Sequence, residues 1–132
     1  MVGLVLISHS ARLAEGLREM VCQVARLDHQ VAAAGGSASG GLGTSAEAIR
    51  QAIDAVDGPD GVLVLMDLGS AVMTAELVLE DLPPARRARV RLSNAPLVEG
   101  AIVAAVQASI GASLDEVATA AESACAIPKL AM

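Results

Sequence analysis

Two side chains with acid–base and nucleophilic chemistry each follow an apolar run of the sequence. His9 comes just after Val2–Ile7 and stands between two serines, and Asp67 follows Gly61–Met66. A carboxylate that accepts a hydrogen bond from Nδ1–H of a histidine selects the tautomer whose Nε2 lone pair is free to attack. The spacing therefore predicts a nucleophilic histidine oriented by an aspartate. The structural alternatives are a histidine that only ends a strand and an aspartate that only caps a helix.

The residues near this pair are of types that bind an anion. Gly35–Ser45 is a glycine-rich stretch before a predicted helix, where bare N–H groups can hold phosphate oxygens. Ser10, Ser45 and Ser70 can donate hydroxyls, although helix capping is the default role of such serines. No lysine follows Gly43 as in a P-loop, and no dinucleotide fingerprint occurs. We therefore expect a small phosphate, or one carried by a partner, and no nucleotide held by this chain.

Other kinds of site fit the sequence less well. A hydrolase of the nucleophile-elbow type needs a G-x-S-x-G motif, which is absent from the sequence. A metal centre needs more ligands than His9 and Asp67 supply, so no metal site is predicted. The net charge of −6 and the lack of Phe, Tyr and Trp make a nucleic-acid partner unexpected, because phosphates are repelled and bases find no stacking partner.

The cellular setting is predicted from apolar segments and cysteines. The stretch 101–114 is too short to span a bilayer, and the N-terminus lacks the basic region of a secretory signal. Cys22 and Cys125 lie in apolar helical patterns and are expected to be buried thiols in a reducing compartment. A cytoplasmic protein without membrane insertion follows. The basic stretch 86–91 is expected to be a solvated strand edge.

The elements that must position these residues alternate along the chain. Apolar runs predict strands at 2–7, 30–34, 61–67 and 89–92, and helical spacing predicts helices at 10–27, 44–56, 71–82, 97–110 and 113–127. Thr44 with Glu47, and Ser113 with Glu116, have the capping-box pattern. The order predicts one α/β domain over 1–132, with a mostly parallel central sheet of four to five strands and helices on both faces.

Four polar or glycine-rich loops follow the predicted strands, at 8–10, 35–45, 67–70 and 93–94. The carboxyl ends of parallel strands open on one edge of the sheet, and ligands bind there where the strand order reverses. The opposite loops are ordinary turns. We therefore expect these four loops to converge on one site.

Four motifs in chain order resemble those of the phosphotransferase subunit of bacterial dihydroxyacetone kinase, which is similar to the mannose-type IIA domain of the sugar phosphotransferase system. They are Val-Leu-Ile-Ser-His9-Ser, Gly40-Gly-Leu-Gly-Thr-Ser45, Met-Asp67-Leu-Gly-Ser-Ala71 and Ser93-Asn-Ala-Pro96. The resemblance covers nearly the whole chain. It implies the mannose-type IIA fold, usually in a homodimer.

The resemblance also implies a chemical role. His9 would carry a phosphoryl group on Nε2, received from the phosphocarrier HPr, and Asp67 would orient the ring. The group would pass to ADP held on the nucleotide-binding subunit of the kinase, and the ATP formed there would phosphorylate dihydroxyacetone, so this chain would need no cofactor of its own. The implied phosphate-binding residues are Ser10, Gly41, Gly43, Thr44, Ser45, Gly69 and Ser70.

Two alternatives stay open beside the kinase subunit. One is a mannose-type sugar-transport component with the same chemistry, and the other is a non-catalytic module that binds a small anion. The sugar-specific relatives usually have glycine after the active histidine, where this chain has Ser10, and they lack the Gly-Gly-Leu-Gly-Thr-Ser run. These differences favour the kinase subunit.

Overall fold

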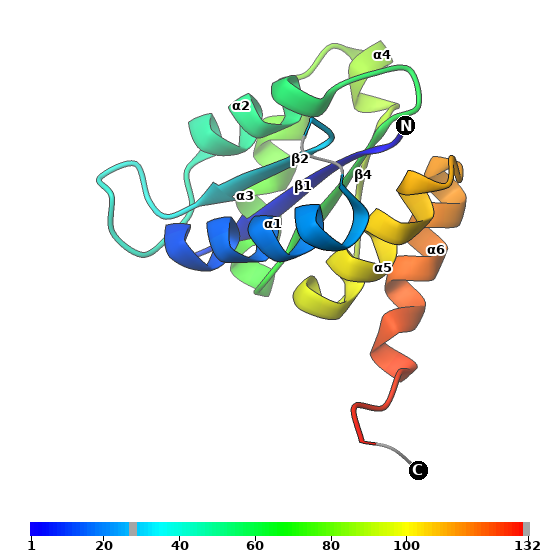
Figure 1. The fold of residues 1–132 in the computed structure, drawn as a ribbon. Coiled ribbons are helices and arrows are strands. Elements are labelled where there is room, and N and C mark those ends of the chain that lie inside the picture. The colour runs from blue at the N-terminus through cyan, green and yellow to red at the C-terminus, as the bar shows by residue number, and fades with distance from the viewer. Residues whose placement is uncertain (27–28, 131–132) are drawn as a thin grey trace.

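Four parallel strands form the central sheet in the order β2-β1-β3-β4 (Figure 1). They are β1 (Gly3–Ser8), β2 (Val31–Gly35), β3 (Val62–Met66) and β4 (Val90–Leu92). This computed structural model describes residues 1–26 and 29–130. The predicted α/β class and parallel sheet are confirmed.

The two central strands, β1 and β3, are buried along their whole length. They are continuously apolar because a parallel strand covered by helices on both faces has no solvated side. Their register pairs Ile7 with Met66, so both strands end at the same level. The strand order reverses between them, and the next residues along each chain segment lead to His9 and Asp67.

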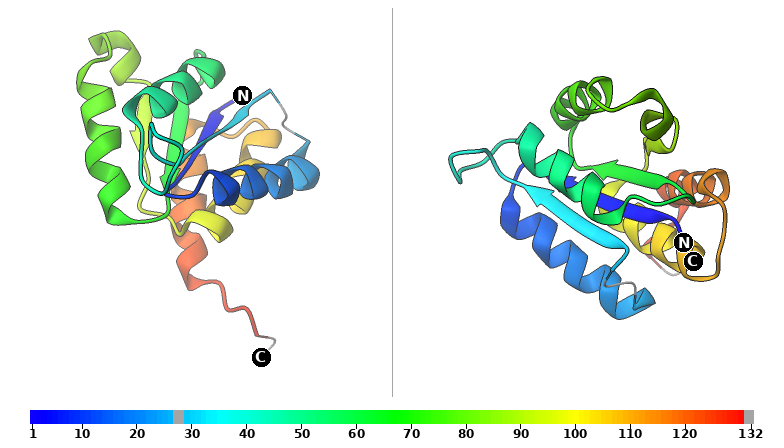
Figure 2. Two further views of the ribbon diagram at one scale, coloured as in Figure 1. Left: turned by 90° about the vertical axis from the view of Figure 1, so that its left-hand side faces the viewer. Right: turned by 90° about the horizontal axis from the view of Figure 1, so that it is seen from above.

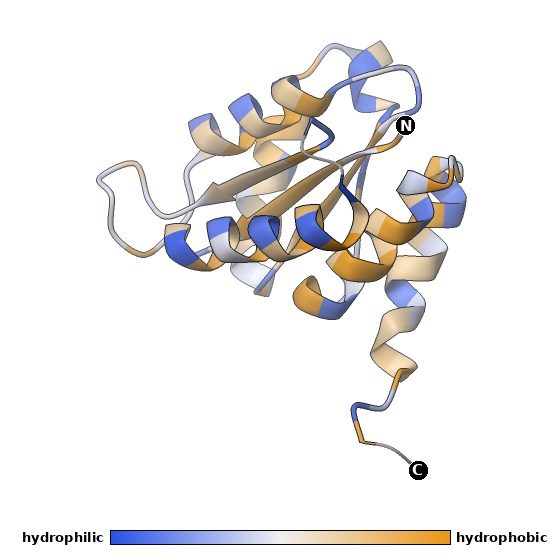
Figure 3. Cartoon of the chain, viewed as in Figure 1, coloured by the Kyte–Doolittle hydropathy of each residue, from blue (hydrophilic) through white to orange (hydrophobic). Residues whose placement is uncertain are grey.

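Helices cover both faces of the sheet (Figure 2). Leu4 and Leu6 of β1 belong to the core shared with α1 (Ala11–Ala25), α5 (Leu97–Ser109) and α6 (Leu114–Ser123). Val5 and Ile7 belong to the opposite core, shared with α2 (Ala46–Val56) and α3 (Gly69–Glu80). This division follows from the two-residue period of a strand. Figure 3 shows the apolar strands enclosed between helices whose polar residues face outward.

The helix ends differ from the predicted ones in informative ways. The hydroxyl of Ser45, and not that of Thr44, accepts the N–H of Ala48 at 3.2 Å at the start of α2. The predicted Thr44–Glu47 capping box is therefore wrong, because Thr44 lies one residue before the cap. The capping box of Ser113 in α6 is confirmed. Helix α1 ends at its C-cap Arg26, and the predicted end at 27 lies outside the described residues.

The basic stretch is a strand edge only at Arg91, which lies in the edge strand β4 and is 41% exposed. Arg86 lies in a short helix, α4 (Pro84–Arg87), which Pro84 can begin because the first helical position needs no N–H donor. Arg86 pairs with Asp54 at 2.6 Å, and both Arg86 and Arg89 pair with Asp57, at 3.2 and 3.3 Å. For Arg86 and Arg89 the prediction fails because their carboxylate partners come from α2 and the loop after it, about thirty residues earlier in the sequence.

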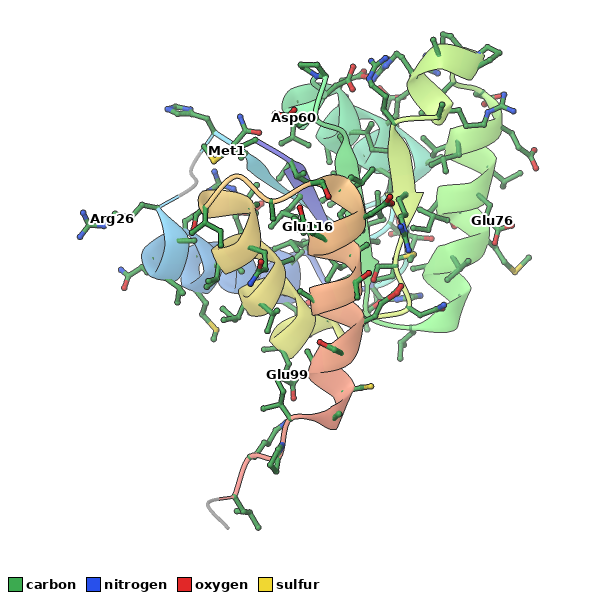
Figure 4. The ribbon with its side chains drawn as sticks, turned by 90° about the vertical axis from the view of Figure 1, so that its right-hand side faces the viewer. Met1, Arg26, Asp60, Glu76, Glu99 and Glu116 are labelled. Carbon is green, nitrogen blue, oxygen red and sulfur yellow. The ribbon has the colours of Figure 1, made fainter. Side chains whose placement is uncertain are left out.

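The two cysteines are a further correction. Cys125 is exposed in the short 3-10 helix η1 (Ala124–Ala126), from which the chain runs away from the sheet (Figure 4), and Cys22 is only partly buried. The prediction of two buried thiols is therefore wrong.

Lys129 forms an ion pair with Glu99 at the start of α5. Within the described residues, no helix has both the length and the apolar character to cross a membrane.

Candidate active site

His9 and Asp67 lie side by side at the carboxyl ends of β1 and β3. The ring Nδ1 of His9 is 2.9 Å from Asp67 Oδ1, and the backbone N–H of His9 donates to Oδ2 at 2.9 Å. The side chains are 25% and 16% exposed, respectively, so the pair lies at the surface without being fully solvated. The structure thus brings together the two residues that the strand-end pattern singles out.

The Asp67 carboxylate accepts hydrogen bonds from four groups. Oδ1 accepts from the His9 ring and from the backbone N–H of Leu68 at 2.8 Å, and Oδ2 accepts from the His9 N–H and the Ser8 hydroxyl at 3.0 Å. Burial raises the pKa of Asp67, but the hydrogen bonds from His9 and Ser8 outweigh it and hold the pKa below its ordinary value. Asp67 is therefore a carboxylate at neutral pH.

The charge on Asp67 selects the tautomer of His9. A carboxylate only accepts hydrogen bonds, so the proton of a neutral His9 ring sits on Nδ1. Nε2 then carries the lone pair and accepts a hydrogen bond from the Ser70 hydroxyl at 2.7 Å. The ring therefore presents a nucleophilic nitrogen on the side away from the carboxylate.

The start of α3 offers anion-binding groups beside Nε2. The helix begins at Gly69, and its N-cap Leu68 makes no side-chain capping bond. The first N–H groups of a helix have no acceptor within the helix, and its dipole favours negative charge there. The predicted phosphate-binding residues Gly69 and Ser70 supply two of these N–H groups, next to the hydroxyl that already touches the ring.

The glycine loop reaches His9 through its backbone. The N–H of Gly43 donates to the carbonyl oxygen of His9 at 2.9 Å, and the N–H of Gly41 donates to the Ser37 hydroxyl at 3.1 Å. Gly40 and Gly43 have positive φ angles, a conformation that glycine adopts without strain. The structure places the loop at the site, but both of these N–H groups are engaged within the protein.

The remaining predicted phosphate-binding residues also have partners. Ser10 accepts the N–H of Leu13 at 3.3 Å and caps α1, as Ser45 caps α2. Thr44 is 2.8 Å from the hydroxyl of Thr74 on α3, a contact that joins the glycine loop to that helix. Each of these three residues therefore has a structural role in the geometry seen here.

The structure adds Ser8, which the sequence reasoning missed. Its side chain is completely buried at the end of β1, where the hydroxyl donates to Asp67 and accepts the N–H of Ser10 at 3.0 Å. A buried hydroxyl is costly unless it is hydrogen-bonded. A serine that ends an otherwise apolar strand is therefore a signal for a polar partner across the sheet edge.

The fourth predicted loop, Ser93–Asn94, lies on the far side of Asp67. It lines a cavity of about 310 Å³ together with Asp67, Gly69 and the start of α5. In the described part of the chain, no cluster of three or more His, Cys, Asp or Glu side chains could hold a metal ion. The side chains in contact with the His9 ring, those of Asp67 and Ser70, are hydrogen-bonding groups.

Comparison with known proteins defines the class to which this fold and site belong. The chain belongs to the family described as "PTS system fructose IIA component", whose model matches residues 3–118. This confirms the resemblance to the mannose-type IIA domain.

The similar proteins narrow the class further. The chain is 46% identical over 120 residues to the "PEP-dependent dihydroxyacetone kinase, phosphoryl donor subunit DhaM" of Escherichia coli (strain K12), covering 89% of this chain but 25% of that protein. It thus spans about a quarter of the length of this relative and of three similar ones. A shorter relative from Listeria innocua serovar 6a, "PEP-dependent dihydroxyacetone kinase 2, phosphoryl donor subunit DhaM", is 35% identical over 117 residues, covering 89% of this chain and 94% of that protein.

Solved structures share the fold. The crystal structure of the protein of unknown function EF1359 superposes with a TM-score of 0.78 at 30% identity, covering 92% of this chain and 94% of that one. A sigma-54 interaction domain protein from Enterococcus faecalis has a TM-score of 0.64 at 17% identity, covering 88% and 84%, and shows the fold alone.

Proposed function

We propose that this chain is a phosphohistidine carrier, the phosphoryl donor subunit of a dihydroxyacetone kinase that depends on phosphoenolpyruvate. The observation that carries the proposal is the geometry of His9: Asp67 holds Nδ1–H, and Nε2 faces outward beside the start of α3. The names of the relatives describe the same role for those proteins. HPr would deliver the phosphoryl group, and ADP on the nucleotide-binding subunit would receive it.

The transfer step follows from the positions of the polar atoms. The Nε2 lone pair attacks the phosphorus atom of the incoming phosphohistidine, and the pair of electrons in the breaking P–N bond returns to the donor nitrogen. The ring of His9 gains positive charge, which the Asp67 carboxylate stabilises without taking its proton. Phosphoryl transfer needs little beyond such alignment and charge balance. In the second transfer, a terminal phosphate oxygen of ADP attacks the phosphorus atom, and the electrons of the breaking P–N bond return to Nε2 of His9.

Ser70 must change its hydrogen bond during this step. Its hydroxyl now donates to Nε2 at 2.7 Å, and that lone pair is needed for attack. Release of the bond frees the hydroxyl to donate to a phosphoryl oxygen, beside the N–H groups of Gly69 and Ser70. The other phosphate-binding residues would contact the phosphoryl group further from Nε2, after giving up their present hydrogen bonds. These residues are Ser10, Gly41, Gly43, Thr44 and Ser45.

We also propose that residues 1–132 act as one IIA domain and that two copies associate. The alanines of α5, which are Ala101, Ala104, Ala105 and Ala108, are buried within one copy. An interface would instead use apolar side chains that this chain exposes, such as Met20 and Val24 on α1. Light scattering tests this: a particle of one 13.2 kDa chain at micromolar concentration would contradict it.

The first experiment tests the carrier role. The protein is incubated with phosphoenolpyruvate, enzyme I and HPr, and intact mass is measured before and after acid treatment. We expect an acid-labile phosphoryl adduct on the wild type and on His29→Ala, the matched variant at the other histidine, and none on His9→Ala. An adduct that survives His9→Ala, or no adduct on the wild type, would contradict the proposal and favour a non-catalytic anion-binding module.

The second experiment separates kinase from sugar transport, an alternative supported by the description of the matching family model as a fructose component. Kinase subunits loaded with ADP and dihydroxyacetone are added to the phosphorylated protein. We expect dihydroxyacetone phosphate to form in step with loss of the adduct. Loss of the adduct only with sugar-transport components would assign the chain to the sugar system.

A further inference from the structure

The described site holds one ionised side chain, Asp67, and it is negative. A phosphoryl group in transit adds about two negative charges, and the whole chain already has a net charge of −6. Enzymes that transfer phosphoryl groups place positive groups against the transferring oxygens, because charge accumulates there in the transition state. The groups in hydrogen-bond contact with the His9 ring, those of Asp67 and Ser70, supply no such charge.

Arg12 is in a position to supply a positive charge near the phosphoryl group. It lies in the first turn of α1, three residues after His9. With Ser10, Gly40, Gly41 and Leu42 it lines a depression of about 290 Å³ between the start of α1 and the glycine loop. The two segments lie side by side in both views of Figure 2.

The charge of Arg12 is not balanced by a carboxylate. Within residues 1–26 and 29–130, no carboxylate forms an ion pair with Arg12, Arg26 or Arg50, whereas Arg86, Arg89 and Arg91 each pair with an aspartate. A cation in the first turn of a helix is unfavourable because the helix dipole is positive there, and the first turn of α1 has no acidic residue to compensate. A residue that breaks a local rule without a structural gain is a candidate for function.

We propose that the Arg12 guanidinium contacts the phosphoryl group while it is transferred to and from Nε2 of His9. This rests on the proposed carrier function. The guanidinium donates hydrogen bonds to the non-bridging oxygens and keeps all its protons, so the bonds made and broken at phosphorus are those given above. Its planar donor geometry matches two phosphoryl oxygens at once, a match that lysine lacks.

Arg12→Gln tests the proposal, with Arg26→Gln as the matched control. Both variants remove one positive charge from α1, but Arg26 is the C-cap of the helix, roughly 20 Å further along its axis. The initial rate of His9 phosphorylation is measured by intact mass over a range of phospho-HPr concentrations. We expect Arg12→Gln to lower kcat by about 10²-fold or more, Arg12→Lys to recover part of the loss, and Arg26→Gln to stay within about twofold of the wild type.

Two results would contradict the role of Arg12. Equal rates for Arg12→Gln and Arg26→Gln, or a change in KM alone, would overturn the contact with the phosphoryl group. Thermal unfolding of each variant tests whether the fold is kept. If Arg12→Gln is less stable than the wild type, the rate of Arg12→Lys, which keeps the positive charge, tests the contact instead. Failure of the wild type to form any adduct would instead overturn the proposed function.

Discussion

At the residue scale, Asp67 has the most exacting role, because its two oxygens accept from four donors. In Asp67→Asn, an NH2 group must face some of these donors. Turned toward the ring, it forces the proton of His9 onto Nε2 and removes the attacking lone pair. We expect phosphorylation by phospho-HPr to slow by about 10²-fold or more with the fold intact.

The control for this prediction is Asp60→Asn, which changes an exposed aspartate at the opposite end of the sheet that pairs with the N-terminus of Met1. Its rate should equal that of the wild type. Unchanged phosphorylation in Asp67→Asn, with time courses followed by intact mass, would reduce Asp67 to a structural acceptor at the end of β3.

The pKa of Asp67 gives a separate prediction for stability. Because the folded state lowers this pKa below the ordinary value of 3.8, the ionised form favours folding. This contribution is fully present above the unfolded pKa and is lost as the pH falls through the folded pKa. Thermal unfolding of the wild type and Asp67→Asn should therefore differ at pH 7, and the difference should shrink below about pH 4. A difference that is independent of pH would contradict the hydrogen-bonded carboxylate.

The contact between His9 and Asp67 was predictable because each residue stands directly after an apolar strand. Ser8 was not, because the role of a strand-ending serine depends on which carboxylate faces it across the sheet. The same limit applies to Thr44, whose partner Thr74 lies thirty residues away. Hydrogen-bond partners between distant segments require the register of the strands, which the sequence pattern does not contain.

At the element scale, β2 passes so close to the start of α1 that only glycine fits at position 35. A Cβ added to Gly35 would lie 2.7 Å from both the Ala11 Cα and the Ser10 carbonyl oxygen. We expect Gly35→Ala to lower the free energy of unfolding by about 1–3 kcal/mol and to slow phosphorylation, because Ser10 must shift next to His9.

Gly16→Ala is the matched control, since a Cβ there would meet nothing within 4 Å and the residue lies inside α1. It should raise the free energy of unfolding by about 0.5–1 kcal/mol. Urea unfolding measures both variants. Equal stability of Gly35→Ala and the wild type would show that β2 and α1 can separate without cost.

The strands β1 and β3 were predictable from their continuous apolar runs, and the helices from their spacing. The helix starts were less so, because Thr44 and Ser45 both suit an N-cap and only the backbone geometry separates them. Helix α4 could not be predicted from apolar spacing, because it has no buried residues. Its Arg86 instead forms an ion pair with Asp54 of α2.

At the scale of the whole molecule, the two ends of the sheet carry different kinds of polar interaction. The carboxyl ends of the strands carry His9 and its hydrogen-bond partners, and the opposite end carries the ion pairs of Arg86 and Arg89 with Asp54 and Asp57. The position of the candidate site could be predicted from the chain order, because parallel strands have their carboxyl ends at one edge of the sheet. The ionic network could not be predicted, since nothing in the chain order says which charges meet at the other edge.

This division predicts that stability and transfer can be changed separately. Arg86→Gln leaves Asp54 without its partner and Asp57 with one arginine instead of two, so we expect unfolding to require about 1–2 kcal/mol less. Arg91→Gln is the control: it removes an arginine whose partner Asp115 is 90% exposed, so its cost should stay below about 0.5 kcal/mol. Both variants should phosphorylate His9 at the wild-type rate below their unfolding temperatures. A slower rate in Arg86→Gln under those conditions would show that the ionic end of the sheet also controls the position of the histidine.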